Sequence, residues 1–310
     1  MKKYDVAIIG AGTAGLTARK EVAKKTDNYI IIDDGPLGTT CARVGCMPSK
    51  VLIQVANDFH RRHSLAQQGI TGSESLGINR DKAMEHVRAL RDRFVKGVKS
   101  SLPQYEDKLI RKRATFIDRN TLDLGDERIY ADKIIIATGS RPIIPGPWRE
   151  YQDYLLTTDE IFEQDKLPES MAVIGLGVIG IELGQALNRL GVNVLAAGLG
   201  KEIGGATEPS LQDYIVKKLS EEMPIYTNGA NITGVSDGKL QIEVDGNSVP
   251  VDKAIIAVGR RPNTDKLGLE NLDESYAGKV PDFNRDDFRL QKFDNIFLVG
   301  DVTAERTLLH

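Results

Sequence analysis

The sequence predicts an α/β fold of two similar three-layer domains, each built on a mostly parallel sheet, with the second inserted into the first. Short, continuous apolar runs, typical of strands buried on both faces of a parallel sheet, lead into a glycine-rich turn at Gly10 and again at Gly175. The segment Asp132–Pro142 returns as Asp252–Pro262 with eight of eleven positions identical. An internal duplication explains both repeats.

In the first half, Val6–Gly10 is the first expected strand. Apolar residues then recur every three or four positions over 14–25, which predicts a helix, and Tyr29–Ile32 is the next strand. The segment 51–102 is mostly helical in pattern. The two strands and the helix over 14–25 between them form a βαβ unit.

The second half repeats this order. Met171–Gly175 is a strand, 179–190 a helix and Val192–Leu195 the following strand. A last apolar run, Asn295–Val299, lies beyond the second unit, and we expect it to return to the first sheet. Pro and Gly near 147 and 280 mark the crossings, which gives a first domain of 1–147 and 280–310 and a second of 148–279.

Composition excludes several classes of protein. The 310 residues include 41 Lys and Arg against 44 Asp and Glu, a net charge of −3, so no global charge favours nucleic acid or an anionic membrane. No apolar run reaches the length of a membrane span, and the N-terminal apolar run is too short for a signal peptide. We expect a cytoplasmic protein without nucleic-acid or membrane partners.

The first glycine turn has every part of a dinucleotide-binding fingerprint. Gly10, Gly12 and Gly15 have the Gly-x-Gly-x-x-Gly spacing, and Asp33 follows the next strand. The glycines let a pyrophosphate approach the helix N-terminus, and the carboxylate accepts hydrogen bonds from a ribose. This predicts a Rossmann-like nucleotide site rather than an unliganded turn.

A second fingerprint implies a second dinucleotide. Gly175, Gly177 and Gly180 repeat the spacing, but no acid ends the following strand. The first carboxylate afterwards is Glu202, and Lys201 is the local cation. NAD is therefore only weakly preferred over NADP.

Cys41 and Cys46 are the only cysteines, and they follow Asp33 closely. A regular helix separates such positions too far for a disulfide, so closure needs a distorted turn, which Gly45 can provide. A strained bridge of this kind suits redox catalysis. Inert thiols or half of a metal site are the alternatives, but no second Cys or His pair stands at metal spacing, so we expect no metal.

Two further charged residues stand at helix starts. Lys50 lies one turn after Cys46, where a cation stabilises a thiolate or polarises a redox cofactor, and Glu182 lies just inside the second glycine-loop helix. Spacing alone does not distinguish these roles from a solvent-facing lysine and a carboxylate that interacts with the helix dipole.

Together these motifs resemble the FAD-dependent pyridine nucleotide–disulfide oxidoreductases, and within them the dihydrolipoamide dehydrogenases. The resemblance covers the whole chain and rests on the two glycine loops, Thr40–Lys50, Ala137–Gly139, Glu182, Ala257–Asn263 and Gly300-Asp301. It implies FAD in the first domain and NAD in the second, and electron transfer between a small-molecule or lipoyl-domain dithiol such as dihydrolipoamide, the cysteine pair, FAD and NAD(H).

The resemblance also implies residue roles. Cys41 matches the thiol that exchanges with substrate, Cys46 the thiol beside the flavin, and Lys50 with Glu182 the pair near its reactive nitrogen. The remaining implied contacts to FAD are Asp33, Thr40, Ala114, Thr138, Gly139 and Asp301, and those to NAD are Gly259 and Arg260.

Departures from the family pattern modify these expectations. Thr39 replaces a usual glycine before Thr-Cys. The family continues into a dimer-forming domain that supplies a His–Glu base, whereas this sequence ends at His310 and has no His-x-x-x-x-Glu pair. We therefore expect a chain that lacks the dimerisation domain, ends at an artificial boundary, is monomeric where its parent is a homodimer, and is poorly active on its dithiol.

Two other functions remain open. One is a related disulfide reductase acting on glutathione or mercuric ion. The other is a flavin-containing redox sensor that uses Cys41 and Cys46 as a switch without turnover.

Overall fold

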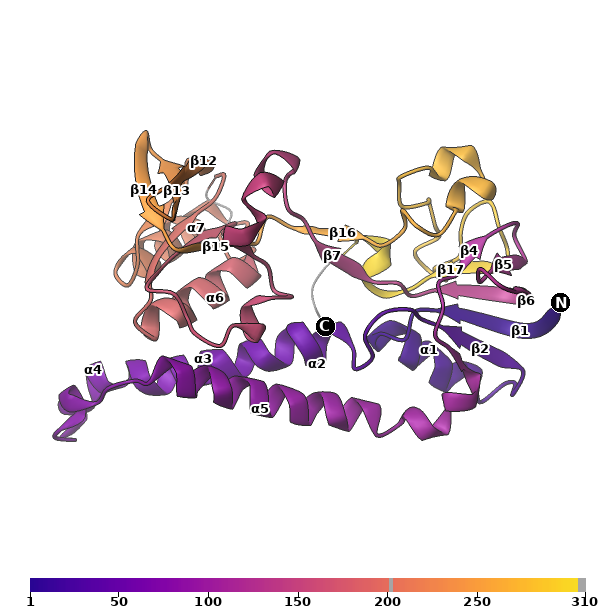
Figure 1. Ribbon diagram of the computed structural model, residues 1–310, viewed down its shortest axis with the longest axis horizontal. Helices are drawn as coiled ribbons and strands as arrows, with labels where there is room; N and C mark the ends of the chain where they lie inside the picture. The colour runs from indigo at the N-terminus through magenta and orange to yellow at the C-terminus, as the bar shows by residue number, and fades with distance from the viewer. Residues whose placement is uncertain (201–202, 306–310) are drawn as a thin grey trace. The chain divides into compact units, whose positions relative to one another are not determined.

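The computed structural model describes residues 1–200 and 203–305 and confirms the α/β fold with parallel sheets (Figure 1). Packing divides the chain into two compact units. Unit 1 comprises Met1–Arg43, Arg93–Arg141 and Arg260–His310, and unit 2 comprises Val44–Asp92 and Pro142–Gly259. This division follows packing alone, so the boundaries near 147 and 280 stay a prediction.

Unit 1 contains a seven-stranded sheet. Its strands, in spatial order, are β3 (Leu109–Ile110), β2 (Tyr29–Ile32), β1 (Lys2–Ile9), β6 (Arg128–Ile136), β5 (Thr121–Asp123) and β4 (Thr115–Phe116), with β17 (Ile296–Leu298) also paired to β6. The pairs from β3 to β6 are parallel, and β4 and β5 are antiparallel additions.

The C-terminal strand returns to the first sheet as predicted. Strand β17 pairs in parallel with β6, and Ile296 lies opposite Ile134. Both residues are fully buried in the same hydrophobic cluster, so this pairing adds the C-terminal strand to the core of unit 1.

Unit 2 repeats the parallel arrangement with five strands. In spatial order they are β11 (Ile225–Tyr226), β10 (Asn193–Ala197), β9 (Ser170–Ile174), β15 (Lys253–Ile256) and β8 (Leu155–Leu156). A separate antiparallel sheet contains β12 (Asn231–Ser236), β13 (Lys239–Val244) and β14 (Asn247–Val251). The two short strands β7 (Ser140–Pro142) and β16 (Arg260–Pro262) pair with each other.

The α-helices of the described residues include the segments predicted to be helical, whereas the helices at Thr40–Val44 and Pro209–Ser220 were not predicted. In chain order, the helices are α1 (Thr13–Val22), α2 (Thr40–Val44), α3 (Cys46–His60), α4 (Arg62–Leu65), α5 (Arg80–Lys99), α6 (Val178–Arg189) and α7 (Pro209–Ser220). Helix α1 ends three residues before its predicted end, because the N–H groups of Lys24 and Lys25 bond to carbonyls three residues back and form a tighter turn.

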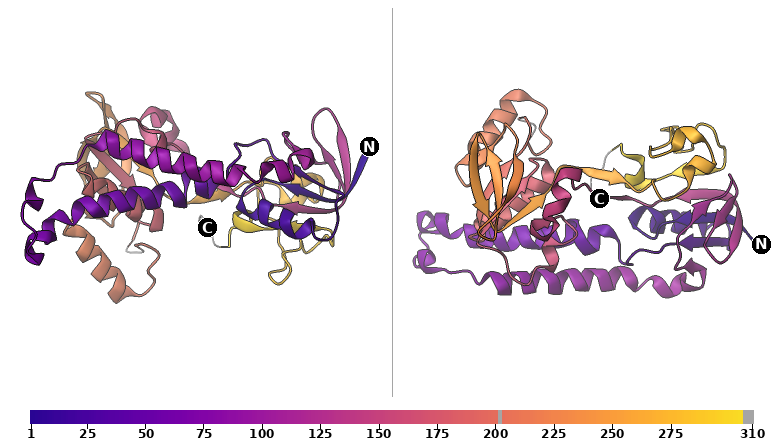
Figure 2. Two further views of the ribbon diagram at one scale, coloured as in Figure 1. Left: turned by 90° about the horizontal axis from the view of Figure 1, so that it is seen from below. Right: turned by 45° about the horizontal axis from the view of Figure 1, so that its top comes forward.

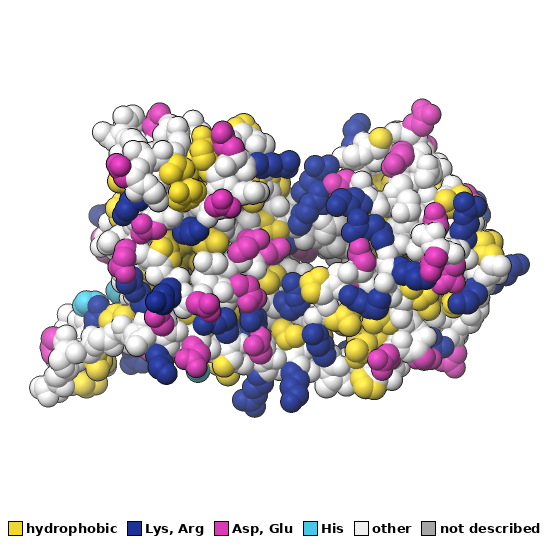
Figure 3. Space-filling model, viewed as in Figure 1, with side chains coloured by type: hydrophobic (Ala, Val, Ile, Leu, Met, Phe, Trp, Pro, Cys, Tyr) yellow, Lys and Arg dark blue, Asp and Glu magenta, His cyan; other side chains and the backbone are white. Residues whose placement is uncertain are grey.

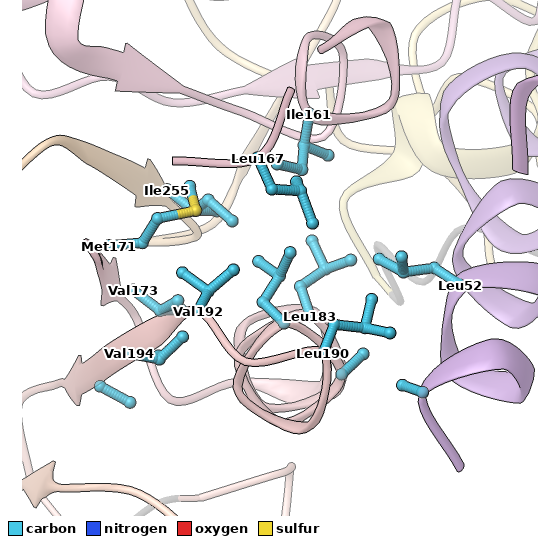
Figure 4. Packing of buried hydrophobic residues seen from close by; sticks show 14 of the residues in the cluster. Leu52, Ile161, Leu167, Met171, Val173, Leu183, Leu190, Val192, Val194 and Ile255 are labelled. Carbon is cyan, nitrogen blue, oxygen red and sulfur yellow. The ribbon is translucent and has the colours of Figure 1, made fainter. Parts of the chain in front are cut away.

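The core of unit 2 contains a helical hairpin. Helix α3 and the first half of α5 run side by side in Figures 1 and 2, and both contribute to the cluster around α6. Figure 4 shows Leu52 of α3 facing Leu183 of α6 and Leu190, the residue that follows α6. Burial of such side chains contributes about 1.5–3 kcal/mol each, so tertiary packing fixes α3 to α6.

The surface carries no simple charge pattern on the side that Figure 3 presents, where Lys and Arg are interspersed with Asp and Glu. This agrees with the near-neutral net charge of −3. Among the described residues, no helix combines the length and apolar character that crossing a membrane requires.

Candidate functional site

The first glycine loop lies between β1 and α1 in unit 1. Gly10 has φ +109°, and a Cβ there would lie 2.4 Å from the carbonyl oxygen of Ala137. A Cβ on Gly15 would lie 1.9 Å from the carbonyl oxygen of Gly10, so this glycine allows α1 to pack against β1. A Cβ on Gly12 would meet nothing within 4 Å. The loop therefore offers open space at the helix N-terminus, which fits a pyrophosphate.

Asp33 lies directly after β2, beside this loop. Its Oδ2 accepts a hydrogen bond from the N–H of Ala11 at 2.5 Å, and its Oδ1 accepts from the N–H of Gly35 at 2.7 Å. Arg111 forms an ion pair with the same carboxylate at 3.4 Å. These contacts hold the carboxylate at the edge of the sheet, in the position where an acid of a Rossmann-type fold binds a ribose.

An open pocket of about 450 Å³ adjoins the loop and lies entirely within unit 1. It contains most of the residues predicted for the first nucleotide. The predicted residues in its lining are Gly10, Gly12, Asp33, Thr40, Cys41, Ala114, Thr138, Gly139 and Asp301. Gly15 is not in the lining, in agreement with its packing role.

Cys41 reaches this pocket from helix α2, and it forms no disulfide with Cys46. Thr39 precedes the helix with φ +61°, a left-handed conformation that is uncommon for a β-branched residue. Its Oγ1 accepts a hydrogen bond from the N–H of Ala42 at 3.2 Å. Thr39 thus caps the helix that carries Cys41, in a strained backbone conformation.

Asp301 enters the pocket from the turn after β17. Its Oδ2 accepts a hydrogen bond from Ser140 Oγ at 3.0 Å, and Arg260 Nε donates to that hydroxyl at 2.8 Å. Arg260 also lines this pocket, although the sequence assigned it to the second nucleotide. That assignment stays a prediction.

Sequence reasoning missed other charged residues, of which Arg113, Arg141 and Asp265 line this pocket and Arg111 lies beside it, paired with Asp33. Arg111 donates to the carbonyl of Gly35, and Arg113 donates to Asp34 Oδ2 at 2.6 Å. Arg141 pairs with Asp265 at 2.6 Å and holds the pKa of that carboxyl below its usual range. The signal for Arg111 and Arg113 was available, since a basic run follows the short apolar pair that forms β3.

The second glycine loop, between β9 and α6 in unit 2, repeats the geometry of the first. Gly175 has φ +116°, and a Cβ there would lie 2.2 Å from the carbonyl oxygen of Ala257. A Cβ on Gly180 would lie 1.9 Å from the carbonyl oxygen of Gly175, whereas one on Gly177 would meet nothing within 4 Å. The backbone thus fits a second pyrophosphate.

The position that follows β10 carries Gly198, so the structure places no acid where Asp33 stands in unit 1. Gly259 has φ +121° just beyond β15. Lys201 and Glu202, which the sequence offered as local charges, lie outside the described residues.

The structure joins Lys50 and Glu182 within unit 2. Lys50 Nζ donates to Glu182 Oε1 at 2.6 Å, although 132 positions separate them in the sequence. Helices α3 and α6, which carry them, pack against each other. Cys46 is the first residue of α3, one turn before Lys50.

Comparisons with known proteins agree with this geometry. The family model described as pyridine nucleotide-disulphide oxidoreductase matches residues 4–310. A dihydrolipoyl dehydrogenase of Staphylococcus aureus is 30% identical over 323 residues, covering 99% of this chain and 67% of the relative. A mercuric reductase of Lysinibacillus sphaericus is 28% identical, covering 97% of this chain and 56% of the relative.

Among solved structures, the Cu(II) complex of the HOCl-induced flavoprotein disulfide reductase RclA from Escherichia coli has a similar fold. The TM-score is 0.81 at 22% identity, over 100% of this chain and 68% of that chain. The chain therefore spans about two thirds or less of the length of these relatives.

Proposed function

Because this chain belongs to the pyridine nucleotide-disulphide oxidoreductase family, a family that binds FAD and pyridine nucleotide, we propose that it carries the electron-transferring part of a dithiol–disulfide oxidoreductase. In this proposal unit 1 binds FAD, unit 2 binds NAD(H), and Cys41 with Cys46 exchanges electrons with a dithiol such as dihydrolipoamide.

One observation carries the proposal. Cys41 lines the same pocket as the open turn at Gly12 and the carboxylates of Asp33 and Asp301. A half-buried thiol in a pocket lined by carboxylates suits redox chemistry better than a structural role, because structural thiols are usually buried in apolar surroundings.

The cysteines perform the exchange with the dithiol. In the oxidised protein, a substrate thiolate attacks the sulfur of Cys41 in a Cys41–Cys46 disulfide, and Cys46 leaves as a thiolate. The second substrate thiolate then displaces Cys41, so the substrate becomes a disulfide and the protein a dithiol.

Other residues bind and orient. When bound, the flavin supplies two-electron transfer between thiols and a nicotinamide. Gly12 and Asp33 would hold its pyrophosphate and adenosine ribose, Asp301 its ribityl chain, and the pair of Lys50 with Glu182 would lie near its reactive nitrogen.

The test is a visible spectrum of the purified, FAD-loaded chain during anaerobic titration with dithionite. We expect long-wavelength charge-transfer absorbance after two electrons in the wild type and no such band in Cys46→Ser. In Cys41→Ser, the matched control, Cys46 has no disulfide partner, so the band should be present before any electrons are added and should disappear as the flavin is reduced. A chain that binds no flavin, or a wild-type titration without the band, contradicts the proposal.

The substrate needs a separate assay. Turnover of NADH is measured with lipoamide, glutathione disulfide and Hg(II) in parallel, and with an artificial acceptor as a positive control. Preference for lipoamide supports the dihydrolipoamide proposal. A mercuric reductase among the relatives makes Hg(II) the alternative, which a higher rate with that ion would favour.

A further inference from the structure

The residue after β10 occupies the same backbone position as Asp33. In unit 1, the N–H of Gly10 donates to Ile32 O at 2.8 Å, and in unit 2 the N–H of Gly175 donates to Ala197 O at 2.8 Å. The next residues, Asp33 and Gly198, therefore correspond, and so do Ala11 and Leu176 inside the glycine loops.

The pair in unit 1 forms a hydrogen bond, whereas the pair in unit 2 leaves no space for a side chain at position 198. The carboxylate of Asp33 accepts a hydrogen bond from the N–H of Ala11, so the small Ala11 leaves room for an acid. A Cβ built on Gly198 would lie 2.8 Å from Leu176 Cγ and 3.1 Å from Leu176 N. Leu176 therefore blocks the path that a carboxylate at position 198 would follow.

Leu176 is firmly held in this place. It is only 4% exposed and belongs to the main core cluster of unit 2, together with the fully buried Ile203. Its carbonyl oxygen accepts a hydrogen bond from the N–H of Gly204 at 2.8 Å. Packing and backbone bonding both oppose a shift that would make space for an acid.

The neighbouring position is neutral as well. Leu199, which corresponds to Asp34, is 87% exposed and aliphatic. Positions 198 and 199 thus present no carboxylate to bind a ribose 2′-hydroxyl and repel a 2′-phosphate, and no base to attract one. Discrimination between NAD⁺ and NADP⁺ needs a group that attracts one of them or repels the other, such as a carboxylate or a basic side chain at the 2′ position.

We propose that Leu176 and Gly198 determine the nucleotide specificity of unit 2 by removing, at the end of β10, the carboxylate that would bind a 2′-hydroxyl and repel a 2′-phosphate, so that NAD⁺ and NADP⁺ bind with similar affinity. The proposal rests on the proposed role of unit 2 as the pyridine-nucleotide unit. Affinity then comes from contacts that both nucleotides share, above all the pyrophosphate at the open turn of Gly177.

The test is calorimetric titration of the FAD-saturated chain with NAD⁺ and with NADP⁺. We expect Kd values within about fivefold of each other, and a preference for NAD⁺ of about tenfold or more in Leu176→Ala/Gly198→Asp, which copies the residues of the first loop. Leu176→Ala alone is the matched control, since it makes room without adding an acid, and its ratio stays within about fivefold.

A wild-type preference of tenfold or more for either nucleotide overturns the proposal, as does a folded double variant whose ratio equals that of the wild type. The ratio of the two Kd values is also measured on the wild-type chain alone, so the proposal stays testable if the double variant does not fold. Failure of the proposed function has another signature: no flavin is retained, no charge-transfer band forms, or neither nucleotide binds.

Discussion

The two glycine loops have the same shape and different chemistry. The Cβ positions of Gly15 and Gly180 would each lie 1.9 Å from the carbonyl oxygen of the first glycine in their loop, and both middle glycines face open space. The residue after β2 is Asp33, whereas the residue after β10 is Gly198. The side chain of Leu176 occupies the space that a larger residue at position 198 would need. The two loops therefore share a backbone shape that fits a pyrophosphate and differ in the two residues beside it.

The largest predicted effect is a loss of stability when a side chain is added to the third glycine of either loop. Gly15→Ala and Gly180→Ala should each lower the free energy of unfolding of their unit by about 3 kcal/mol or more, because the new Cβ collides with backbone and α1 or α6 must shift. Thermal unfolding measures the loss. Gly12→Ala and Gly177→Ala are the controls, and an equal loss of stability in them would refute the steric difference.

The next prediction converts the first loop into the second. Ala11→Leu/Asp33→Gly removes the carboxylate and fills its place, which should weaken FAD binding by about 10- to 100-fold, the equivalent of a charged hydrogen bond of 1.5–3 kcal/mol. Fluorescence titration of the apoprotein with FAD gives the Kd. Asp34→Asn is the control for a neighbouring acid, and a comparable loss there would show that general charge decides affinity.

A third prediction concerns the response of unit 2 to acid. Arg189 donates to both carboxylate oxygens of Glu222 at 2.7 Å within unit 2 and holds its pKa below the ordinary value of 4.5. Because the folded pKa is depressed, this stabilisation is complete above pH 4.5 and is lost as the pH falls through the folded pKa.

Glu222→Gln should therefore destabilise unit 2 by about 1 kcal/mol at pH 7, and the difference from the wild type should shrink below the ordinary pKa of Glu. Urea unfolding at several pH values measures it. A deficit that stays constant into the acid range would exclude the ionised pair as its cause.

The smallest effect concerns Thr39, for which the second loop has no equivalent. Thr39→Gly relieves the left-handed backbone but loses the bond to Ala42, so stability should change by less than about 0.5 kcal/mol. Thr39→Ala keeps the strain and loses the bond, at a cost of about 1 kcal/mol. Equal stabilities of the two variants in urea unfolding would show that the cap contributes nothing.

Local patterns were sufficient to predict the fold class and the glycine turn after β1. Continuous apolar runs define β1 and β9, and glycine spacing with Asp33 defines a turn whose steric demands are local. Strand β17 was predictable as a return because its apolar run lies outside the second repeat.

Contacts between distant residues were not predictable in this way. The Lys50–Glu182 pair spans 132 positions and exists because α3 packs on α6. The hairpin of α3 and the first half of α5 packs with unit 2, a choice that depends on the shape of the assembled core. Nothing in the sequence distinguishes Leu176 from other apolar residues. Its effect on position 198 becomes visible only in the structure, where the two residues are in close contact.

The close contact between Leu176 and Gly198 also constrains how this sequence can evolve. An acid that arises first at position 198 meets the side chain and backbone of Leu176, so that single step damages the unit. The change from Leu176 to a small residue must come first, and it brings no ribose contact of its own. Acquisition of an acid at position 198 therefore has one favoured mutational order, in which the first change brings no gain in nucleotide binding.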